Sequence, residues 1–161
     1  MRWVILTLAC CLPLLSGCIR SDNEQFWHMA SRKDGVWQVD RMIVYRLDPN
    51  HVLQSVFIVE KPGKFYFTED KKGDNKFLEF DGKVLLDSVF NMPFQCPKQP
   101  LTNLGTSFVT SSDGTGTGEG SNMYFVSYVS RQKLNFYTTW EQNYFSTLGS
   151  EFNIYFECTR P

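Results

Sequence analysis

The chain has 161 residues and is almost neutral, with 16 lysine and arginine side chains against 17 aspartate and glutamate side chains. Because no basic cluster exceeds Lys71-Lys72, this balance argues against nucleic acid as a partner. Aromatic residues make up 16% of the chain. Such residues favour strands and large cores, so we expect a folded domain and not a disordered tail.

The N-terminal segment has the features of a secretory leader. Arg2 is its one charged residue, and residues 3–15 form an uncharged, mainly apolar run. That run is shorter than the roughly 20 residues of a membrane-spanning helix, and it is typical of a signal peptide.

The leader ends in Leu15-Ser16-Gly17-Cys18, which resembles the lipobox of bacterial lipoproteins. The resemblance implies that residues 1–17 are cleaved and that Cys18 becomes a lipidated N-terminus. The alternative is a plain signal peptide with a cysteine nearby.

The resemblance also implies where the chain works. Two or three acyl chains, such as palmitate, would anchor Cys18 stably, so no further membrane contact is needed. In enteric-type bacteria an aspartate directly after the cysteine favours the inner membrane. Ile19 and Arg20 stand there instead, so we expect an outer-membrane anchor with the domain facing the periplasm.

Once Cys18 is lipidated, Cys96 and Cys158 are the two remaining cysteines of the mature chain. In an oxidising compartment we expect them to form a disulfide, which would contribute roughly 4 kcal/mol by closing a long loop. Two free buried thiols are the alternative. A metal site is disfavoured, because neither cysteine has another Cys or His at ligand spacing. We expect no cofactor.

The mature chain is long enough for one domain and too short for two. Residues 18–34 are expected to be a lipidated tether with a possible short helix from Asp22 or Asn23, and residues 35–161 a single β-domain. The first strand places Trp37, Val39, Ile43, Tyr45 and Leu47 on one face, which Arg41 interrupts.

Turn residues divide the domain into short strands. Turns are predicted at residues 48–50 and 61–64, and Asp81-Gly82 predicts a hairpin. Three prolines within residues 91–103 exclude a central strand, so that segment is predicted to be a long connection. Residues 139–149 could form a strand end or a short helix. The predicted strands cover residues 36–47, 52–59, 64–68, 76–80, 83–90, 105–112, 122–130, 133–140 and 151–158.

Eight or nine strands in hairpin order, without a helix of usual length between them, predict an all-β fold. We expect an antiparallel meander that forms a small barrel or sandwich with one disulfide.

Motifs for catalysis are weak. The glycine-rich segment 113–121 lacks the Gly-Lys-Ser/Thr of a phosphate loop and has too few carboxylates for calcium, so we interpret it as a loop. The chain contains two histidines, His28 and His51, but no Gly-x-Ser-x-Gly motif that would supply a nucleophilic serine for either of them. Four carboxylates sit where a hairpin tip or a strand edge is predicted: Glu69, Asp70, Asp74 and Asp87. We therefore expect no enzyme.

Gly35-Val36-Trp37 resembles the Gly-x-Trp that opens the first strand of lipocalins, although the family's later Thr-Asp-Tyr motif is not found. A chance match at a strand start is the alternative. The resemblance implies a barrel whose interior would hold a small apolar ligand. The residues expected to line it are Trp37, Phe57, Phe67 and Tyr128.

Three functions follow from these features. The leading hypothesis is a non-catalytic lipoprotein that binds another protein, for example in an immunity or envelope-accessory role. The second is a lipocalin-like carrier, which needs an enclosed apolar cavity. The third is an envelope hydrolase, which needs converging carboxylates or a histidine dyad in a cleft.

The lipobox gives a direct test. We expect Cys18→Ala to abolish lipid labelling and to leave a larger precursor, because the lipoprotein peptidase acts only on the modified cysteine. Metabolic labelling with a fatty acid and the apparent mass on a gel measure both effects. Normal processing of the variant would exclude the lipobox.

Overall fold

The computed structural model describes residues 22–88, 92–103, 105–111, 121–142 and 151–161. The leader, Cys18 and nearly all of the glycine-rich segment lie outside the described residues, as do residues 143–149 of the possible helix.

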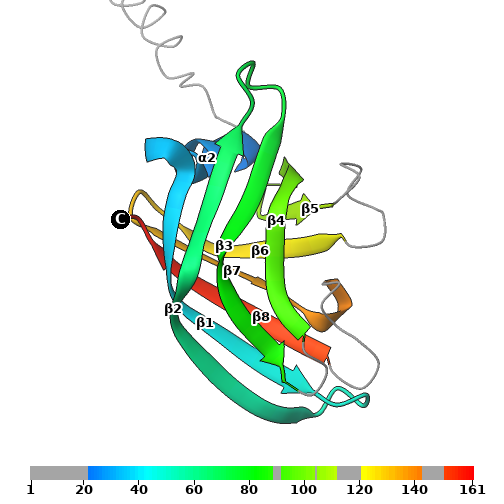
Figure 1. The fold of residues 1–161 in the computed structure, drawn as a ribbon. Helices are drawn as coiled ribbons and strands as arrows, with labels where there is room; N and C mark the ends of the chain where they lie inside the picture. The colour runs from blue at the N-terminus through cyan, green and yellow to red at the C-terminus, as the bar shows by residue number, and fades with distance from the viewer. Residues whose placement is uncertain (1–21, 89–91, 104, 112–120, 143–150) are drawn as a thin grey trace, which may run out of the picture.

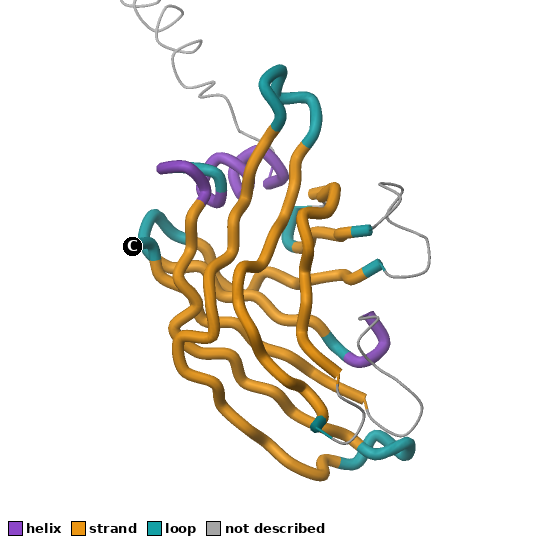
Figure 2. Tube along the Cα trace, in the orientation of Figure 1, coloured by secondary structure: helices purple, strands orange, loops and turns teal. Residues whose placement is uncertain are grey.

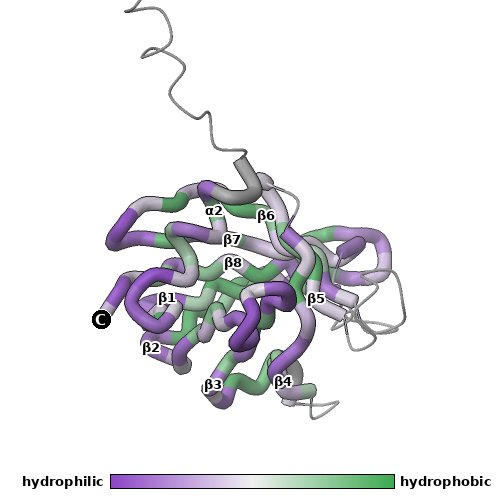
Figure 3. Tube along the Cα trace, turned by 90° about the horizontal axis from the view of Figure 1, so that it is seen from above, coloured by the Kyte–Doolittle hydropathy of each residue, from purple (hydrophilic) through white to green (hydrophobic). Residues whose placement is uncertain are grey.

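The fold is a closed antiparallel barrel of eight strands in chain order, with the last strand paired to the first. The ring of strands can be followed in Figure 1 and from above in Figure 3, and Figure 2 shows how little of the chain is helical. The all-β meander is therefore confirmed, in its barrel form. The strands are β1 (Val36–Leu47), β2 (Leu53–Glu69), β3 (Lys76–Asp87), β4 (Met92–Asn103), β5 (Ser107–Thr110), β6 (Asn122–Val129), β7 (Lys133–Thr138) and β8 (Glu151–Thr159).

Aromatic side chains fill the middle of the barrel. The ring of Phe65 lies 4.9–5.1 Å from the rings of Phe80, Phe136 and Phe156, measured between centroids. Phe94 packs 5.3 Å from Phe156 on the facing wall. An eight-stranded barrel is just wide enough for side chains to fill, and edge-to-face rings of this kind add about 0.5–1.5 kcal/mol per pair to their burial.

The first strand contains a bulge that corrects the predicted face. The pairing of β1 with both β2 and β8 shifts between Val39 and Arg41. Because a bulge adds one residue, the alternation reverses beyond it. Met42 and Val44 are consequently buried, whereas Ile43 and Tyr45 face outward. The interruption at Arg41 was the sequence signal of this bulge.

Two predicted turns are corners within long strands. The turn at residues 61–64 lies inside β2, and the predicted hairpin at Asp81-Gly82 lies inside β3. The two corners meet, because Gly63 is the cross-strand partner of Gly82. A Cβ atom on Gly63 would lie 2.6 Å from the Cα of Gly82 and would clash with the Asp81 carbonyl oxygen. Glycine is thus required by close approach of two backbones.

Residues 92–103 form β4 and not the predicted connection. The prolines are tolerated because β4 is an edge along most of its length: in the described part of the chain, β5 pairs only with its last three residues, 101–103. Pro93 lies opposite Leu85 and Pro100 opposite Phe77, in a ladder with several register shifts. Prolines in sheets are confined to such edges and irregular positions.

A helix, α2 (Asp22–Ala30), closes one end of the barrel. It confirms the predicted short helix, and it inserts Phe26, whose ring stacks 5.5 Å from that of Phe108. Within the described residues, no helix is long and apolar enough to cross a membrane.

Arg160, near the C-terminus, stabilises the end of the barrel that α2 closes. The guanidinium of Arg160 lies 4.1 Å over the ring of Trp37 and donates hydrogen bonds to the carbonyl oxygens of Met29, Arg32 and Arg131. Trp37 in turn donates from Nε1 to the Ala30 carbonyl oxygen at 2.8 Å. One cation–π contact and four hydrogen bonds therefore join β1, the helical entry, the β6–β7 turn and the chain end.

The predicted disulfide is absent: Cys96 and Cys158 are both buried free thiols. Strand order gives the reason. Cys96 lies on β4 and Cys158 on β8, which are four strands apart in either direction around the ring. The two cysteines thus stand on opposite walls, whereas a disulfide requires Cα atoms within about 7 Å.

The two thiols should be inert until the chain unfolds. Burial raises the pKa of Cys96 to about 12 and raises the pKa of Cys158 well above its usual value, so the reactive thiolates are scarce. We expect a chain that begins at Ile19 to show no thiol reactive toward an aromatic disulfide reagent when folded, and two after denaturation. A count of zero after denaturation would indicate a disulfide instead.

The corner of the barrel should not tolerate a side chain. We expect Gly63→Ala to lower the free energy of unfolding by about 3 kcal/mol, the upper end of what overpacking costs. Gly73→Ala is the matched control, because Gly73 has a φ of 77° but open space around it, and it should cost only about 1–2 kcal/mol of backbone strain. Urea denaturation measures both. Equal losses would show that the backbone contact is not what requires glycine.

Candidate interaction surface

The outside of the barrel carries a continuous row of apolar side chains. Strand register defines it: Phe125 is the partner of Tyr137, Tyr137 of Tyr155, Tyr155 of Ile43, and Ile43 of Ile58. Directly opposed residues of neighbouring strands point to the same face. We call these five residues, one each from β6, β7, β8, β1 and β2, the outer row.

The rings of the outer row are stacked on one another. Phe125 lies 5.4 Å from Tyr137, and Tyr137 lies 5.0 Å from Tyr155, both in near-parallel orientation. Tyr45 lies on the same outer face of β1, two positions further along the strand. Its ring packs edge-on against that of Tyr155, with 5.5 Å between the ring centroids. Such stacking fixes the rings in place, so a partner would lose little side-chain entropy by covering them.

The hydroxyl of Tyr155 remains available as a neutral donor. Partial burial raises the pKa of Tyr155, and the nearby hydroxyls of Tyr137 and Tyr45 raise it further. Tyr155 nevertheless keeps 39% of its surface exposed, and Ile58 keeps 53%. Tyrosine combines a large apolar body with a polar tip, which is why it is enriched in protein interfaces.

Polar residues border the outer row on one side. Tyr128, Asn135, Glu157, Arg41 and Glu60 form the next cross-strand series. Within it, Arg41 and Glu157 form an exposed ion pair at 2.5 Å. An apolar centre with a polar rim is the usual anatomy of a protein–protein interface.

The predicted carrier residues do not form one lining. Trp37 and Phe67 are fully buried inside the barrel, and Phe57 is half-buried against the core. Tyr128 was wrongly predicted to face inward: it is 52% exposed, because a register shift between Val126 and Tyr128 turns it outward.

The interior also contains polar groups that an apolar ligand would not match. The hydroxyls of Thr110, Tyr124 and Thr138 are buried and have no hydrogen-bond partner among the described residues. Burying a hydroxyl against an apolar molecule leaves its desolvation cost uncompensated. This feature, together with the packed rings at the centre, disfavours an apolar cargo in the described part of the barrel.

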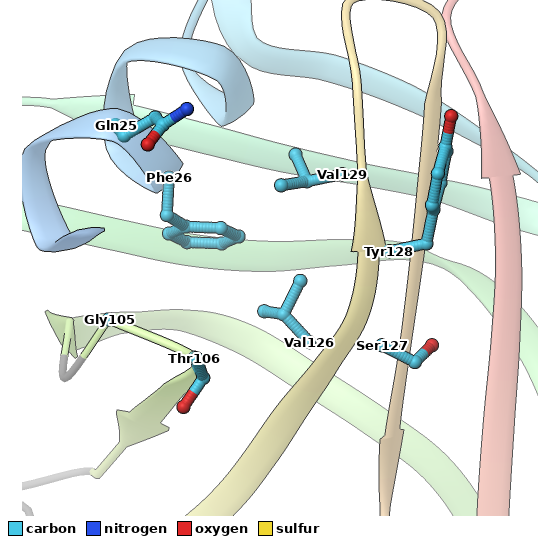
Figure 4. A pocket seen from close by; sticks show the side chains of 8 residues that line it. All are labelled: Gln25, Phe26, Gly105, Thr106, Val126, Ser127, Tyr128 and Val129. Atoms are coloured by element: carbon cyan, nitrogen blue, oxygen red, sulfur yellow. The ribbon is translucent and has the colours of Figure 1, made fainter.

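One surface pocket lies between α2 and β6, where Phe26, Val126 and Val129 project toward one another (Figure 4). Its volume is 240 Å³ and it opens to the surface. Sites for drug-sized molecules usually enclose roughly 300–1,000 Å³. The pocket is therefore too small and too open to carry a ligand assignment.

The structure brings one histidine to a carboxylate. Nδ1 of His51 lies 2.7 Å from Oε2 of Glu151, and the imidazole stacks 4.0 Å from the ring of Trp140. His51 lies on an exposed turn with 48% of its side chain accessible, whereas Glu151 begins β8 and keeps only 19% accessible. Among the described residues no hydroxyl or thiol bonds to His51, so a nucleophile for this base is missing there.

The other predicted site residues hold turns and packing contacts. Asp70 accepts hydrogen bonds from the Asn75 side chain and from backbone N–H groups, and these lower its pKa against an opposing effect of burial. Glu69 accepts from Nε1 of Trp27, and His28 is exposed on α2. The side chain of Asp87 lies outside the described residues. In the described ranges, no three His, Cys, Asp or Glu residues could hold a metal ion.

No family model and no curated protein matches this chain. Among solved structures, it is similar to a deswapped triple mutant of bovine odorant binding protein, with 14% sequence identity and a TM-score of 0.38. That similarity covers 79% of this chain and 72% of the bovine chain. The fold assignment rests on the strand pairing described above, and the Gly-x-Trp resemblance stays a prediction.

Proposed function

We propose that this protein is a non-catalytic, lipid-anchored envelope protein that binds another protein through the outer row. The observation that carries the proposal is the row itself: five partly exposed apolar side chains in register across five strands, with its three rings stacked. Contiguous apolar patches with polar borders on a soluble domain usually mark binding sites.

The anchor follows from the sequence. Lipidation at Cys18 would hold the domain at the periplasmic face of the outer membrane without use of its surface apolar residues. The outer row would then be free for a protein partner. An immunity or an envelope-accessory role would suit such an anchored binding domain.

The rival functions receive less support. The carrier hypothesis needs an enclosed apolar cavity, whereas the described interior combines packed rings with buried hydroxyls. The hydrolase hypothesis needs a dyad in a cleft, whereas His51 pairs with Glu151 from an exposed turn. Neither arrangement supplies what its function requires.

Site-specific photocrosslinking tests the proposal. A photoreactive phenylalanine analogue placed at Tyr155 of the anchored chain should crosslink to one partner protein in cells, because Tyr155 lies at the centre of the row. Tyr66 is the matched control: a half-buried tyrosine, flanked by buried Phe65 and Phe67 and thus facing outward on a different part of the barrel.

The native chain should compete with the photoreactive chain for the partner, and Tyr155→Ala should compete at least about tenfold less well, the loss typical of a central aromatic contact. Equal crosslinking at Tyr66 and Tyr155, or none at Tyr155, would exclude the outer row as the binding surface.

A further inference from the structure

Strands β2 and β3 are paired along only part of their length. Their register begins at Gly63 and Gly82 and continues to the hairpin tip. Residues 53–60 pair with β1 alone, residues 61–62 lie at the bulge before Gly63, and residues 83–87 pair with β4 alone. Among the described residues no backbone hydrogen bond joins these two segments, which diverge below the glycine corner (Figure 1). We call the opening between these two unpaired edges, one on β2 and one on β3, the split.

Exposed apolar residues concentrate at the split. The described residues include seven exposed large hydrophobic side chains, and five of them belong to these edges or directly precede them. The inner side is apolar too, since half-buried Phe57 and Val59 pack against the core. The five residues are Val52, Leu53, Val56, Ile58 and Leu85.

Between the bulge at Gln54 and the charged residue Glu60, the edge of β2 lacks the features that block strand addition. Natural edge strands carry prolines, charges or bulges. The β4 edge follows this rule with Pro93 and Pro97. In contrast, residues 53–59 of β2 contain neither a proline nor a charged residue. This segment is therefore a template for another strand.

Two exposed lysines stand at the closed end of the split, together with the exposed carboxylates of Glu60 and Asp81. Lys61 and Lys83 lie next to the glycine corner, both are exposed, and neither forms an ion pair with a described residue. A negative group at this end of an added strand would be paired with two lysines.

We infer that the partner supplies an extended segment that adds to β2 in the split. The segment has apolar residues at alternate positions and an acidic residue or a C-terminal carboxylate beside Lys61 and Lys83. Main-chain hydrogen bonds supply affinity in this mode, and alternate side chains supply specificity. This inference rests on the proposed function and adds the chemistry of the partner.

The position of the split relative to the outer row supports this mode. Ile58 is both the last residue of the row and part of the β2 edge. A strand added at β2 would therefore place its outward side chains directly after Ile58 and lengthen the apolar row by one strand. One partner could cover both features.

A synthetic peptide of alternating valine and threonine with a C-terminal glutamate serves as the probe. We expect it to bind the purified chain, as measured by fluorescence anisotropy, and to slow hydrogen exchange at residues 53–60. The double variant Lys61→Glu/Lys83→Glu should bind it about 100-fold more weakly, about tenfold per reversed charge. The same variant should prefer a peptide that ends in lysine amide.

Lys71→Glu/Lys72→Glu is the matched control, with the same change in net charge on the hairpin tip at the other end of β2. Its affinity should equal that of the native chain. Absence of peptide binding, protection away from residues 53–60, or equal loss in both double variants would overturn the inference.

Photocrosslinking separates this inference from the proposed function. With the photoreactive analogue at Leu85, the partner captured at Tyr155 should also be captured. Capture at Tyr155 without capture at Leu85 would overturn strand addition and leave the outer row as the binding surface. Capture of a second copy of this chain at Leu85 would show that the split is a self-association edge and would also overturn the inference.

Discussion

The contact between Gly63 and Gly82 determines how the barrel is built. Two backbones can approach this closely only where neither residue has a side chain. Each strand bends there, so the pair is hydrogen-bonded on the side of the hairpin tip and separate on the other side. The closed barrel, the continuous strands and the split all depend on this corner.

The packed interior explains why aromatic residues also appear outside. Side chains alternate between the two faces of a strand, and the inward positions are already filled by rings in mutual contact. The remaining aromatic residues on β6, β7 and β8 therefore face outward at matching positions. Because the barrel is narrow, the aromatic residues that do not fit inside it lie on its surface. A carrier would not need aromatic residues there.

The sequence could predict what depends on local pattern. The alternation of residues 151–158 predicted β8 and its buried face correctly, and hairpin order predicted the antiparallel meander but not its closure into a barrel. Bulges and corners were harder to predict from the sequence. Asp81-Gly82, for example, suits a hairpin turn and a bend within a strand equally well. Only the other strand, with Gly63 against it, distinguishes the two.

Features that combine distant strands could not be predicted. The disulfide failed because the alternation that buries Cys158 says nothing of which wall holds Cys96, and the two lie on opposite walls. The outer row needs the register of five strands at once, and β1 changes face at its bulge. His51 and Glu151 meet across 100 positions of sequence. In each case the sequence shows which residue types are present, but it does not show which residues from distant strands lie beside them.

The proposed anchor and the described fold together orient the binding features. Only residues 19–21 separate Cys18 from α2, and three extended residues span at most about 11 Å. The α2 end of the barrel would thus lie close to the membrane. The split begins beyond the glycine corner and extends away from α2 (Figure 1). A lipidated chain would therefore present the open edge of β2 toward the periplasm, where an extended segment of a partner could reach it.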